Sequence, residues 1–233
     1  IDSSGLKYVE AYPRQPIGNG IEGTMDFNMN AATRAKIREM LAASGLKLIA
    51  YGVVKASGRE EWKKVFEFCK DLGIQTITCE PKKRDLEVVS SLCDDYKINA
   101  AIHNHPAPTA YWSPDSVLNA IKGKSARLGA CADIGHWVRS GLDPVACLKK
   151  LKGHVLHFHF KDISQIDNKA TSEVIWGSGL CNIPGVMQEM RAQQFKGKIS
   201  VEYEHNLNNS VEPVVKSAAY FRNNLKATEK DSR

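Results

Sequence analysis

The sequence has no long uninterrupted apolar run, although 42% of its 233 residues are hydrophobic. A helix that crosses a bilayer needs about 20 consecutive apolar residues, so no membrane-spanning helix is expected. The first residues also lack the basic segment followed by an apolar segment that marks a signal peptide. We therefore expect a soluble protein that is cytoplasmic, or periplasmic after removal of a signal peptide.

The sequence also lacks paired cysteines. None of its six cysteines forms a CxxC motif or shows the spacing of a zinc knuckle. Several of them fall within apolar patterns, so they are interpreted as small buried hydrophobic residues, which favours a reducing compartment. The cysteines are Cys69, Cys79, Cys93, Cys131, Cys147 and Cys181.

A strong charge of either sign is absent as well. The chain carries 32 Lys and Arg against 26 Asp and Glu, for a net charge of +6. This mildly basic balance is compatible with an anionic small substrate or with weak affinity for nucleic acid, but most charges simply lie on solvated faces. The compact basic run at residues 82–84 is open to both interpretations: contact with an anionic group, or an exposed cluster without a ligand.

No Pro- or Ser-rich linker divides the chain, which predicts one domain over residues 1–227 and a frayed tail over residues 228–233. Short β-branched runs alternate with amphipathic helical patterns such as Ala31–Ala43 and Glu60–Leu72. The predicted strands are Leu6–Tyr12, Lys47–Val53, Thr76–Glu80, Ile98–Asn104, Leu128–Asp133, Val155–Phe160 and Ile199–Tyr203.

This alternation of strands and helices predicts right-handed crossovers and a parallel sheet. Seven strands suggest an α/β fold of the (β/α)8 TIM-barrel type that lacks its first β/α unit in this chain. The segment Gly18–Gly23 matches GxGxxG, but two prolines separate it from the preceding strand and a helix starts only near Asn30. A dinucleotide site needs the glycines to open the helix directly, so this match is rejected.

Histidine is absent from the first hundred residues, and all seven histidines lie between residues 103 and 205. Six of them, all except His154, lie at or just beyond a predicted strand end. Successive late strands end in the sequences TITCEP, AIHNHP, CADIGHW, HFHFKD and SVEYEHN. In a barrel the carboxyl ends of the strands form the active-site face, so carboxylates and imidazoles are expected to converge there.

Side chains two residues apart on a strand share a face. His157 and His159 therefore point the same way, whereas Phe158 and Phe160 are expected to face the helices. The converging polar groups are costly to bury unless a metal ion or one another satisfies them. His159 lies nearer the strand end than His157 and is the better candidate for a metal ligand.

These motifs together resemble the sugar phosphate isomerase/epimerase family of xylose isomerase-like TIM barrels, over nearly the whole chain. The shared pattern is a strand-end Glu or His, then Asp-x-x-His, then His-x-Lys-Asp, and then a final strand-end Glu. In this sequence the pattern comprises His103, Asp133, His136, His159, Lys161, Asp162 and Glu202.

The resemblance implies one divalent metal ion, namely Mn²⁺, Mg²⁺, Co²⁺ or Zn²⁺. Members of the family hold it with Glu, Asp, His and Glu, and Asp133, His159 and Glu202 match three of these ligands. The first ligand departs from the family pattern, because His-Asn-His replaces the usual Glu-Asn-His. Either His103 replaces that Glu, or Glu80 from the preceding strand completes the site.

The resemblance also implies an isomerase or epimerase that abstracts a proton next to a sugar carbonyl and forms an enediolate. Glu202 is a candidate both for a ligand and for the base. Glu204, His105 and His136 are candidate acid/base partners, and Lys161 is a candidate for holding the oxyanion. If a leaving group lies β to the carbonyl, the same chemistry gives a lyase or dehydratase of keto-sugars or 3-keto-glycosides.

Two alternatives come from other functional classes: an endonuclease IV-like phosphodiesterase, which shares the barrel, and a sugar-binding barrel without catalysis. The nuclease needs more histidines and carboxylates from early strands. The expected partner is therefore a sugar or keto-sugar rather than nucleic acid or a membrane, and a homo-oligomer is compatible with the sequence. Three tryptophans that follow strand ends, Trp112, Trp137 and Trp176, either stack on a sugar ring or cover the barrel mouth.

Overall fold

The computed structural model describes residues 5–166 and 172–230. Its residues fall into two compact units. We call Leu6–His103 with Val117–Cys131 the N-terminal unit, and Ile1–Gly5 with Asn104–Ser116 and Ala132–Arg233 the C-terminal unit. Helix α4 (Pro114–Ile121) and strand β7 (Leu128–Asp133) each pass from one unit to the other. The prediction of a single domain remains a prediction.

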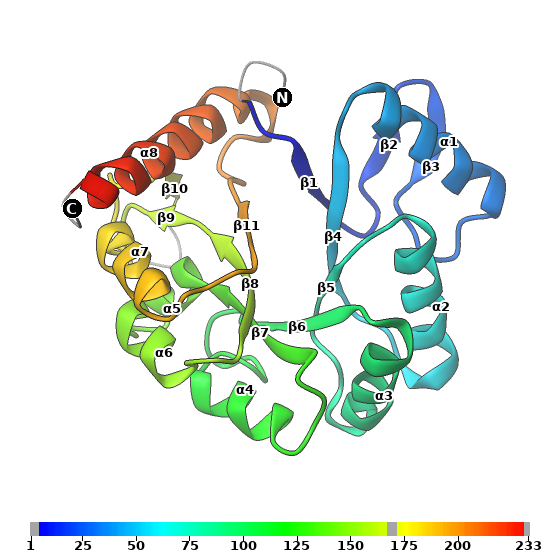
Figure 1. The fold of residues 1–233 in the computed structure, drawn as a ribbon, viewed down its shortest axis with the longest axis horizontal. Helices are drawn as coiled ribbons and strands as arrows, with labels where there is room; N and C mark the ends of the chain where they lie inside the picture. The colour runs from blue at the N-terminus through cyan, green and yellow to red at the C-terminus, as the bar shows by residue number, and fades with distance from the viewer. Residues whose placement is uncertain (1–4, 167–171, 231–233) are drawn as a thin grey trace. The chain divides into compact units, whose positions relative to one another are not determined.

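The N-terminal unit alternates parallel strands with helices. Neighbouring strands pair in parallel in the order β1-β4-β5-β6-β7, and β2 pairs with β3 in an antiparallel hairpin. Helices α2 and α3 pack side by side next to these strands (Figure 1). The elements are β1 (Tyr8–Ala11), β2 (Pro16–Gly18), β3 (Ile21–Thr24), α1 (Ala31–Ala43), β4 (Lys47–Val54), α2 (Gly58–Asp71), β5 (Thr76–Cys79), a 3-10 turn (Lys83–Asp85), α3 (Leu86–Tyr96) and β6 (Asn99–His103).

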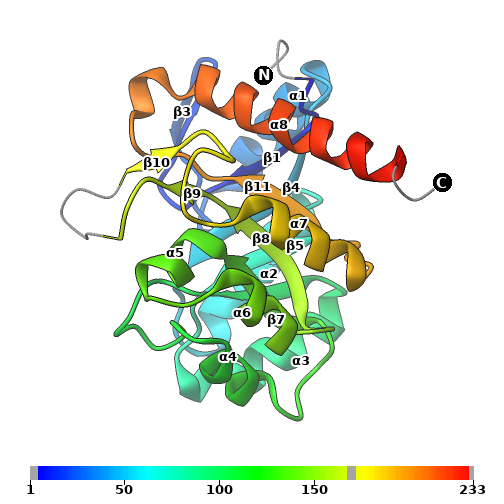
Figure 2. The same ribbon diagram turned by 90° about the vertical axis from the view of Figure 1, so that its left-hand side faces the viewer.

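The C-terminal unit continues the parallel order from the end of β7 to β8 and β11. Helix α8 packs against β11, and α6 packs against both α5 and α7 (Figure 2). Strands β9 and β10 form a short antiparallel pair. The elements are α5 (Ile134–Arg139), α6 (Pro144–Lys150), β8 (Val155–Phe160), β9 (Asp162–Ile163), β10 (Glu173–Val174), α7 (Ile183–Ala192), β11 (Lys198–Val201), a 3-10 turn (Leu207–Asn209) and α8 (Val211–Lys230).

Local sequence signals explain where several helices begin and end. Asn30 caps α1, because its side chain accepts a hydrogen bond from the backbone N–H of Thr33. Asp143 caps α6 in the same way, and Pro144 occupies the first helical turn. Helix α2 ends before Gly73, whose φ of 73° places it in the left-handed region that favours glycine. Each of these boundaries thus follows from a residue at the helix end.

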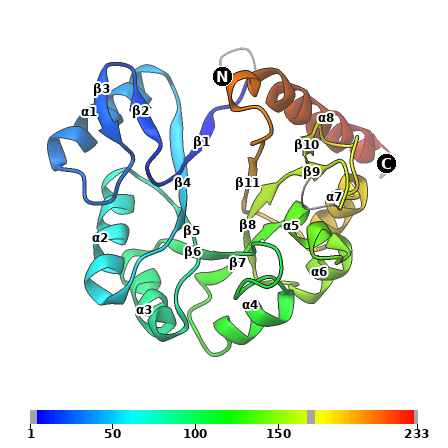
Figure 3. The ribbon, with the colours of Figure 1, turned by 180° about the vertical axis from the view of Figure 1, so that it is seen from behind.

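The predicted strands are all present, with ends that differ by at most two residues. Two short hairpins were not predicted: β2 with β3 in the N-terminal unit, and β9 with β10 in the C-terminal unit, both visible from behind in Figure 3. The rejected GxGxxG segment overlaps the first hairpin, whose turn contains Asn19 and Gly20 at φ of 50° and 75°. The glycines of this segment therefore belong to a β-hairpin.

The buried side of β8 contains the aromatic core of the C-terminal unit. Phe158 contacts the ring of Phe195, and Phe160 contacts the rings of Trp176 and Phe221, with ring centroids 4.9–5.9 Å apart. The prediction that these two residues face the helices is thereby confirmed for Phe160, since Phe221 belongs to α8, and Phe158 packs on the segment that follows α7. The intervening His157 and His159 face the opposite side of the strand.

All six cysteines are buried and unbridged, as the sequence indicated. Within the described ranges, no helix has both the length and the apolar character that crossing a bilayer requires.

Candidate active site

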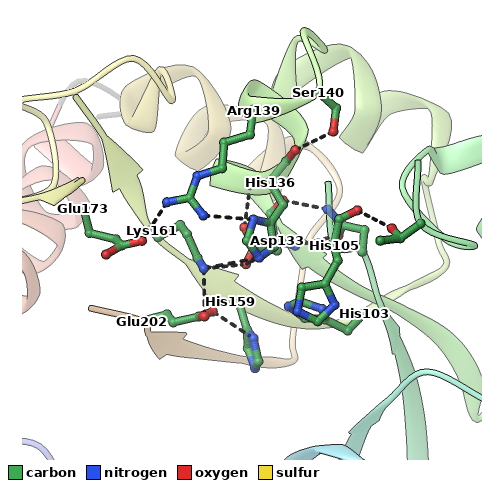
Figure 4. A network of polar contacts seen from close by, with 12 residues as sticks. His103, His105, Asp133, His136, Arg139, Ser140, His159, Lys161, Glu173 and Glu202 are labelled. Carbon is green, nitrogen blue, oxygen red and sulfur yellow. Dashed lines mark hydrogen bonds and ion pairs between the residues drawn. The ribbon is translucent and has the colours of Figure 1, made fainter. Parts of the chain in front are cut away.

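Three strand ends of the C-terminal unit bring their polar side chains together (Figure 4). Asp133 is the last residue of β7, and Glu202 directly follows β11. His159 lies near the end of β8, and Lys161 directly follows that strand. Parallel strands place their carboxyl ends at one edge of a sheet, which explains why residues distant in the sequence meet here.

Asp133 is fully buried and rigidly held. Its Oδ1 accepts a hydrogen bond of 2.8 Å from the backbone N–H of His136, which makes Asp133 the N-cap of α5. The Asn104 side chain binds the Asp133 backbone from both sides, donating to its carbonyl at 2.9 Å and accepting from its N–H at 2.8 Å. These contacts fix the Asp133 carboxylate so that its Oδ2 faces Lys161.

Lys161 is fully buried between two carboxylates. Its Nζ lies 2.7 Å from Oε1 of Glu202 and 3.2 Å from Oδ2 of Asp133. Burial lowers the pKa of the Lys161 ammonium, but Asp133 and Glu202 outweigh burial and raise the pKa above its ordinary value. Lys161 is therefore a permanent cation. A Cβ at Gly135 would overlap Cγ of Lys161, so the lysine stem requires glycine at that position.

Glu202 contacts a different group with each carboxylate oxygen. Oε1 binds Lys161, and Oε2 lies 3.0 Å from Nδ1 of His159. Burial raises the pKa of the Glu202 carboxyl, but Lys161 and His159 outweigh this effect and hold the pKa well below its usual range. Glu202 is therefore ionised at neutral pH.

Asp133, His159 and Glu202 can each offer one ligand atom, and these atoms lie within 4.8 Å of one another. Two carboxylates and one imidazole form a donor set that suits a divalent cation such as Mg²⁺, Mn²⁺ or Zn²⁺. The cation would also offset the net negative charge that remains after Lys161 is counted against the two carboxylates. The residues therefore fit the metal ion that the sequence pattern implied.

Of the predicted acid/base residues, His136 lies beside Asp133 and His105 lies beside His136. Nε2 of His136 is 3.5 Å from Oδ2 of Asp133, and the ring of His105 lies 5.1 Å from the ring of His136. His136 is buried, and His105 is partly exposed. Glu204 lies beyond β11 with an exposed side chain, and its charge contributes to the raised pKa of Lys161.

Glu80 and His103, the two candidates for a fourth ligand, belong to the N-terminal unit. His103 ends β6 and Glu80 follows β5. Nδ1 of His103 lies 3.9 Å from Oε1 of Glu80, and Oε2 of Glu80 lies 2.9 Å from Nζ of Lys55. The structure thus brings the two candidates together within their own unit, and their metal role remains a prediction.

Sequence reasoning missed two charged residues of the site. Arg139, the last residue of α5, lies 3.4 Å from His136 and forms a 2.8 Å ion pair with Glu173 of β10 (Figure 4). No sequence signal identifies Glu173, because its strand has only two residues. The sequence motif His-Asn-His contains Asn104, but sequence reasoning gave this residue no role.

Asp162 of the His-x-Lys-Asp motif has a structural role in the segment 177–181. Its buried carboxylate accepts four backbone hydrogen bonds of 2.9–3.1 Å, which come from Ile163, Gly177, Gly179 and Cys181. A Cβ at Gly179 would overlap this carboxylate. The glycine in this segment thus allows the backbone to close around Asp162.

The tryptophans divide between core and surface. Trp137 and Trp176 are buried, with 1% and 4% of their surface exposed, so both are core residues rather than sugar-stacking platforms. Trp112 is partly exposed. In the basic run, Lys82 and Arg84 are exposed and donate hydrogen bonds to the Ser57 hydroxyl within the N-terminal unit.

Comparisons with known proteins identify the family and the fold of this chain. The family model described as xylose isomerase-like TIM barrel matches residues 1–224. No curated protein matches the chain. A solved structure of an uncharacterised protein from Parabacteroides distasonis ATCC 8503 is 32% identical, with a TM-score of 0.74, and the match covers 94% of this chain and 88% of that one.

Two further solved structures share the fold at low identity. A D-tagatose 3-epimerase-like protein has a TM-score of 0.78 and 17% identity, over 100% of this chain and 93% of its own. A xylose isomerase-like TIM barrel protein from Mycobacterium smegmatis, solved in complex with magnesium, has a TM-score of 0.75 and 14% identity, over 97% and 86%. The prediction of a TIM-barrel fold is confirmed by the family match and by these structures.

Proposed function

Because the chain belongs to the xylose isomerase-like TIM-barrel family, we propose that it is a divalent-metal-dependent sugar isomerase or epimerase. The reaction is transfer of a proton on the carbon next to a sugar carbonyl. The observation that carries the proposal is the convergence of Asp133, His159 and Glu202 around the buried ammonium of Lys161. Similarity to the epimerase-like and magnesium-bound structures supports the reaction class and the metal.

Asp133, His159 and Glu202 would hold the divalent cation, which would polarise the substrate carbonyl and offset the negative charge developing on its oxygen. Lys161 adds a second, permanent positive charge to the same site. An ammonium group has three hydrogen-bond donors, so Lys161 can hold its carboxylate partners and still donate to a substrate oxygen. In a buried site such a preorganised charge stabilises an oxyanion more strongly than it would in water.

Glu202 serves first as a ligand in this proposal. The contacts with Lys161 and His159 that lower the pKa of its carboxyl group also make it a weak base. Removal and return of the substrate proton then fall to Glu204, His105 or His136. His136 lies beside Asp133 and His105 beside His136, and return of the proton to the opposite face or to the next carbon would distinguish epimerisation from isomerisation.

The test is solvent exchange with a panel of ketoses, inososes and 3-keto-glycosides in D₂O. With Mg²⁺ or Mn²⁺, deuterium should enter the carbon next to the carbonyl of the true substrate, and EDTA should stop the exchange. Glu202→Gln should abolish exchange because it removes a ligand charge. Glu212→Gln, which changes an exposed α8 carboxylate paired with Lys216, is the matched control and should exchange normally.

Product identity then assigns the subclass, since an epimer, an isomer and an eliminated sugar differ in mass or chromatography. The proposal is overturned if no panel member exchanges while sugars still bind in EDTA, because this result favours a binding protein. Cleavage of abasic DNA would favour the nuclease alternative instead.

A further inference from the structure

The ion pair between Arg139 and Glu173 lies next to His136, with Arg139 between the other two residues (Figure 4). The Arg139 side chain is 16% exposed and the Glu173 side chain 6%, so both charges are largely removed from water. Buried charges of this kind are costly unless they are paired and hydrogen-bonded. The sequence pattern and the family match assign no role to either residue.

Arg139 constrains the hydrogen positions on His136. Its NH1 lies 3.4 Å from Nδ1 of the imidazole. A guanidinium group has only hydrogen-bond donors, so Nδ1 must be the acceptor in this contact. The ring hydrogen of the neutral imidazole is then on Nε2, the nitrogen that lies 3.5 Å from Oδ2 of Asp133.

The opposite side of His136 is consistent with this tautomer. Nε2 also lies 3.5 Å from Nζ of Lys161, which likewise has only donors. If Nε2 instead accepted from Lys161, the ring hydrogen would be on Nδ1 and would point at the Arg139 guanidinium, which has only donors. The Nε2–H tautomer lets Arg139 donate to Nδ1 and lets Nε2–H donate to Oδ2 of Asp133. The tautomer chosen by Arg139 thus determines which group His136 presents to the metal-ligand side of the site.

Glu173 determines the position of Arg139. A free arginine side chain has many rotamers, and the 2.8 Å contact from NH2 to Oε1 of Glu173 leaves NH1 for His136. Glu173 belongs to β10, which pairs with β9 through Glu173 and Ile163. Strand β9 begins one residue after Lys161, so one short hairpin links the positions of Lys161 and Arg139.

We propose that Arg139, held by Glu173, is a positioning residue that fixes the His136 imidazole as its Nε2–H tautomer facing Asp133. The consequence for catalysis rests on the proposed function, in which His136 is one of three candidates for proton transfer. The tautomer itself is independent of any substrate and can be measured directly.

The measurement is a long-range ¹H–¹⁵N correlation spectrum of the imidazole rings, recorded at a pH at which they are neutral and in Mg²⁺, which is diamagnetic. His136→Gln identifies the His136 signals. The test variants are Arg139→Met, Arg139→Lys and the double variant Arg139→Met with Glu173→Gln. Arg191→Met is the matched control, because Arg191 donates to backbone carbonyls of α8 instead.

The double variant separates positioning from stability. Arg139→Met alone leaves the Glu173 carboxylate buried without its cation and is expected to lower the melting temperature. Neutralising both residues removes that cost, so the double variant should recover most of the lost stability. Its His136 should nevertheless lose the single Nε2–H signature and show a mixture of tautomers. Arg139→Lys keeps the positive charge and tests whether the guanidinium shape is needed. One ammonium cannot contact His136 and Glu173 in the way that the two guanidinium NH₂ groups do.

We expect wild type and Arg191→Met to show the Nε2–H tautomer of His136. In the double variant, kcat for exchange should fall about 10- to 100-fold, the usual size of such indirect effects, with KM little changed. An Nδ1–H tautomer in wild type, or an unchanged Nε2–H tautomer in a folded double variant, overturns the proposal. Absence of exchange in wild type would contradict the proposed function and leave the spectral test intact.

Discussion

Lys161 shares one positive charge between two carboxylates at the centre of the site. Asp133 is fully buried, and the Glu202 side chain is 22% exposed. Replacing the lysine by a neutral side chain leaves both carboxylates close together without their shared cation. Removing one partner of a buried charge pair costs far more than removing one partner of an exposed pair.

Lys161→Met should therefore lower the free energy of unfolding by about 3 kcal/mol, measured by urea denaturation in EDTA. Mg²⁺ should restore part of the loss, since a cation can take over the two carboxylates. The control is Lys150→Met, which removes an exposed 2.6 Å pair with Asp115 and should cost less than about 1 kcal/mol. Equal losses in the two variants would contradict the assigned role of Lys161.

At the residue scale, the sequence predicted the residues that lie at strand ends. Asp133, His159 and Glu202 meet because parallel strands end at one edge, and strand ends can be located from the sequence. Arg139 and Glu173 could not be predicted. Their meeting depends on how a six-residue helix and a two-residue strand pack, and neither element has a periodic pattern.

At the scale of elements, Asp162 holds the segment between β10 and α7 against the end of β8. The two oxygens of its carboxylate accept hydrogen bonds from four backbone N–H groups, and Gly177 and Gly179 share Oδ2. This segment has no regular structure of its own. Its conformation is therefore expected to depend on Asp162 more than on local propensity.

Asp162→Asn replaces one accepting oxygen by an NH₂ group, which leaves two of the four N–H groups without an acceptor. The amides of Gly177 and Gly179, or those of Cys181 and Ile163, should exchange with solvent about 30-fold faster, equivalent to about 2 kcal/mol. The control is Asp143→Asn, since asparagine caps a helix as well as aspartate does. Unchanged protection at all four amides would contradict this role.

Helix α1 could be predicted from the sequence, whereas two short strand pairs could not. Helix α1 has the predicted ends, because its amphipathic pattern and its Asn30 cap agree. The β2–β3 and β9–β10 pairs escaped prediction because their short strands contain Pro, Gly or acidic residues, which are depleted in strands.

At the scale of the whole molecule, the parallel order of the strands in each unit and the family match both indicate a TIM-barrel fold. The candidate ligands Asp133, His159 and Glu202 belong to the C-terminal unit, whereas His103 and Glu80, the two candidates for a fourth ligand, belong to the N-terminal unit. The sequence left the choice between His103 and Glu80 open, because the residue types of both suit a divalent cation.

We predict that either His103→Ala or Glu80→Gln weakens Mn²⁺ binding at least about 10-fold, as expected for loss of a ligand or of a group that orients one. The other variant should change the affinity by much less. Glu87→Gln, an exposed carboxylate of α3 paired with Lys124, is the control. Unchanged affinity in both test variants would show that the N-terminal unit supplies no ligand through these two residues.

The most direct test of the account is a Mn²⁺ titration followed by electron paramagnetic resonance, comparing wild type with Asp133→Asn. Asparagine retains the N-cap of α5, so the variant should fold while it loses a ligand charge. We expect one tightly bound Mn²⁺ per wild-type chain. Its electron spin echo should be modulated by a histidine nitrogen, and this modulation should disappear in His159→Ala. We expect no tight site in Asp133→Asn. Stoichiometric tight binding in folded Asp133→Asn, or none in wild type, would contradict the account.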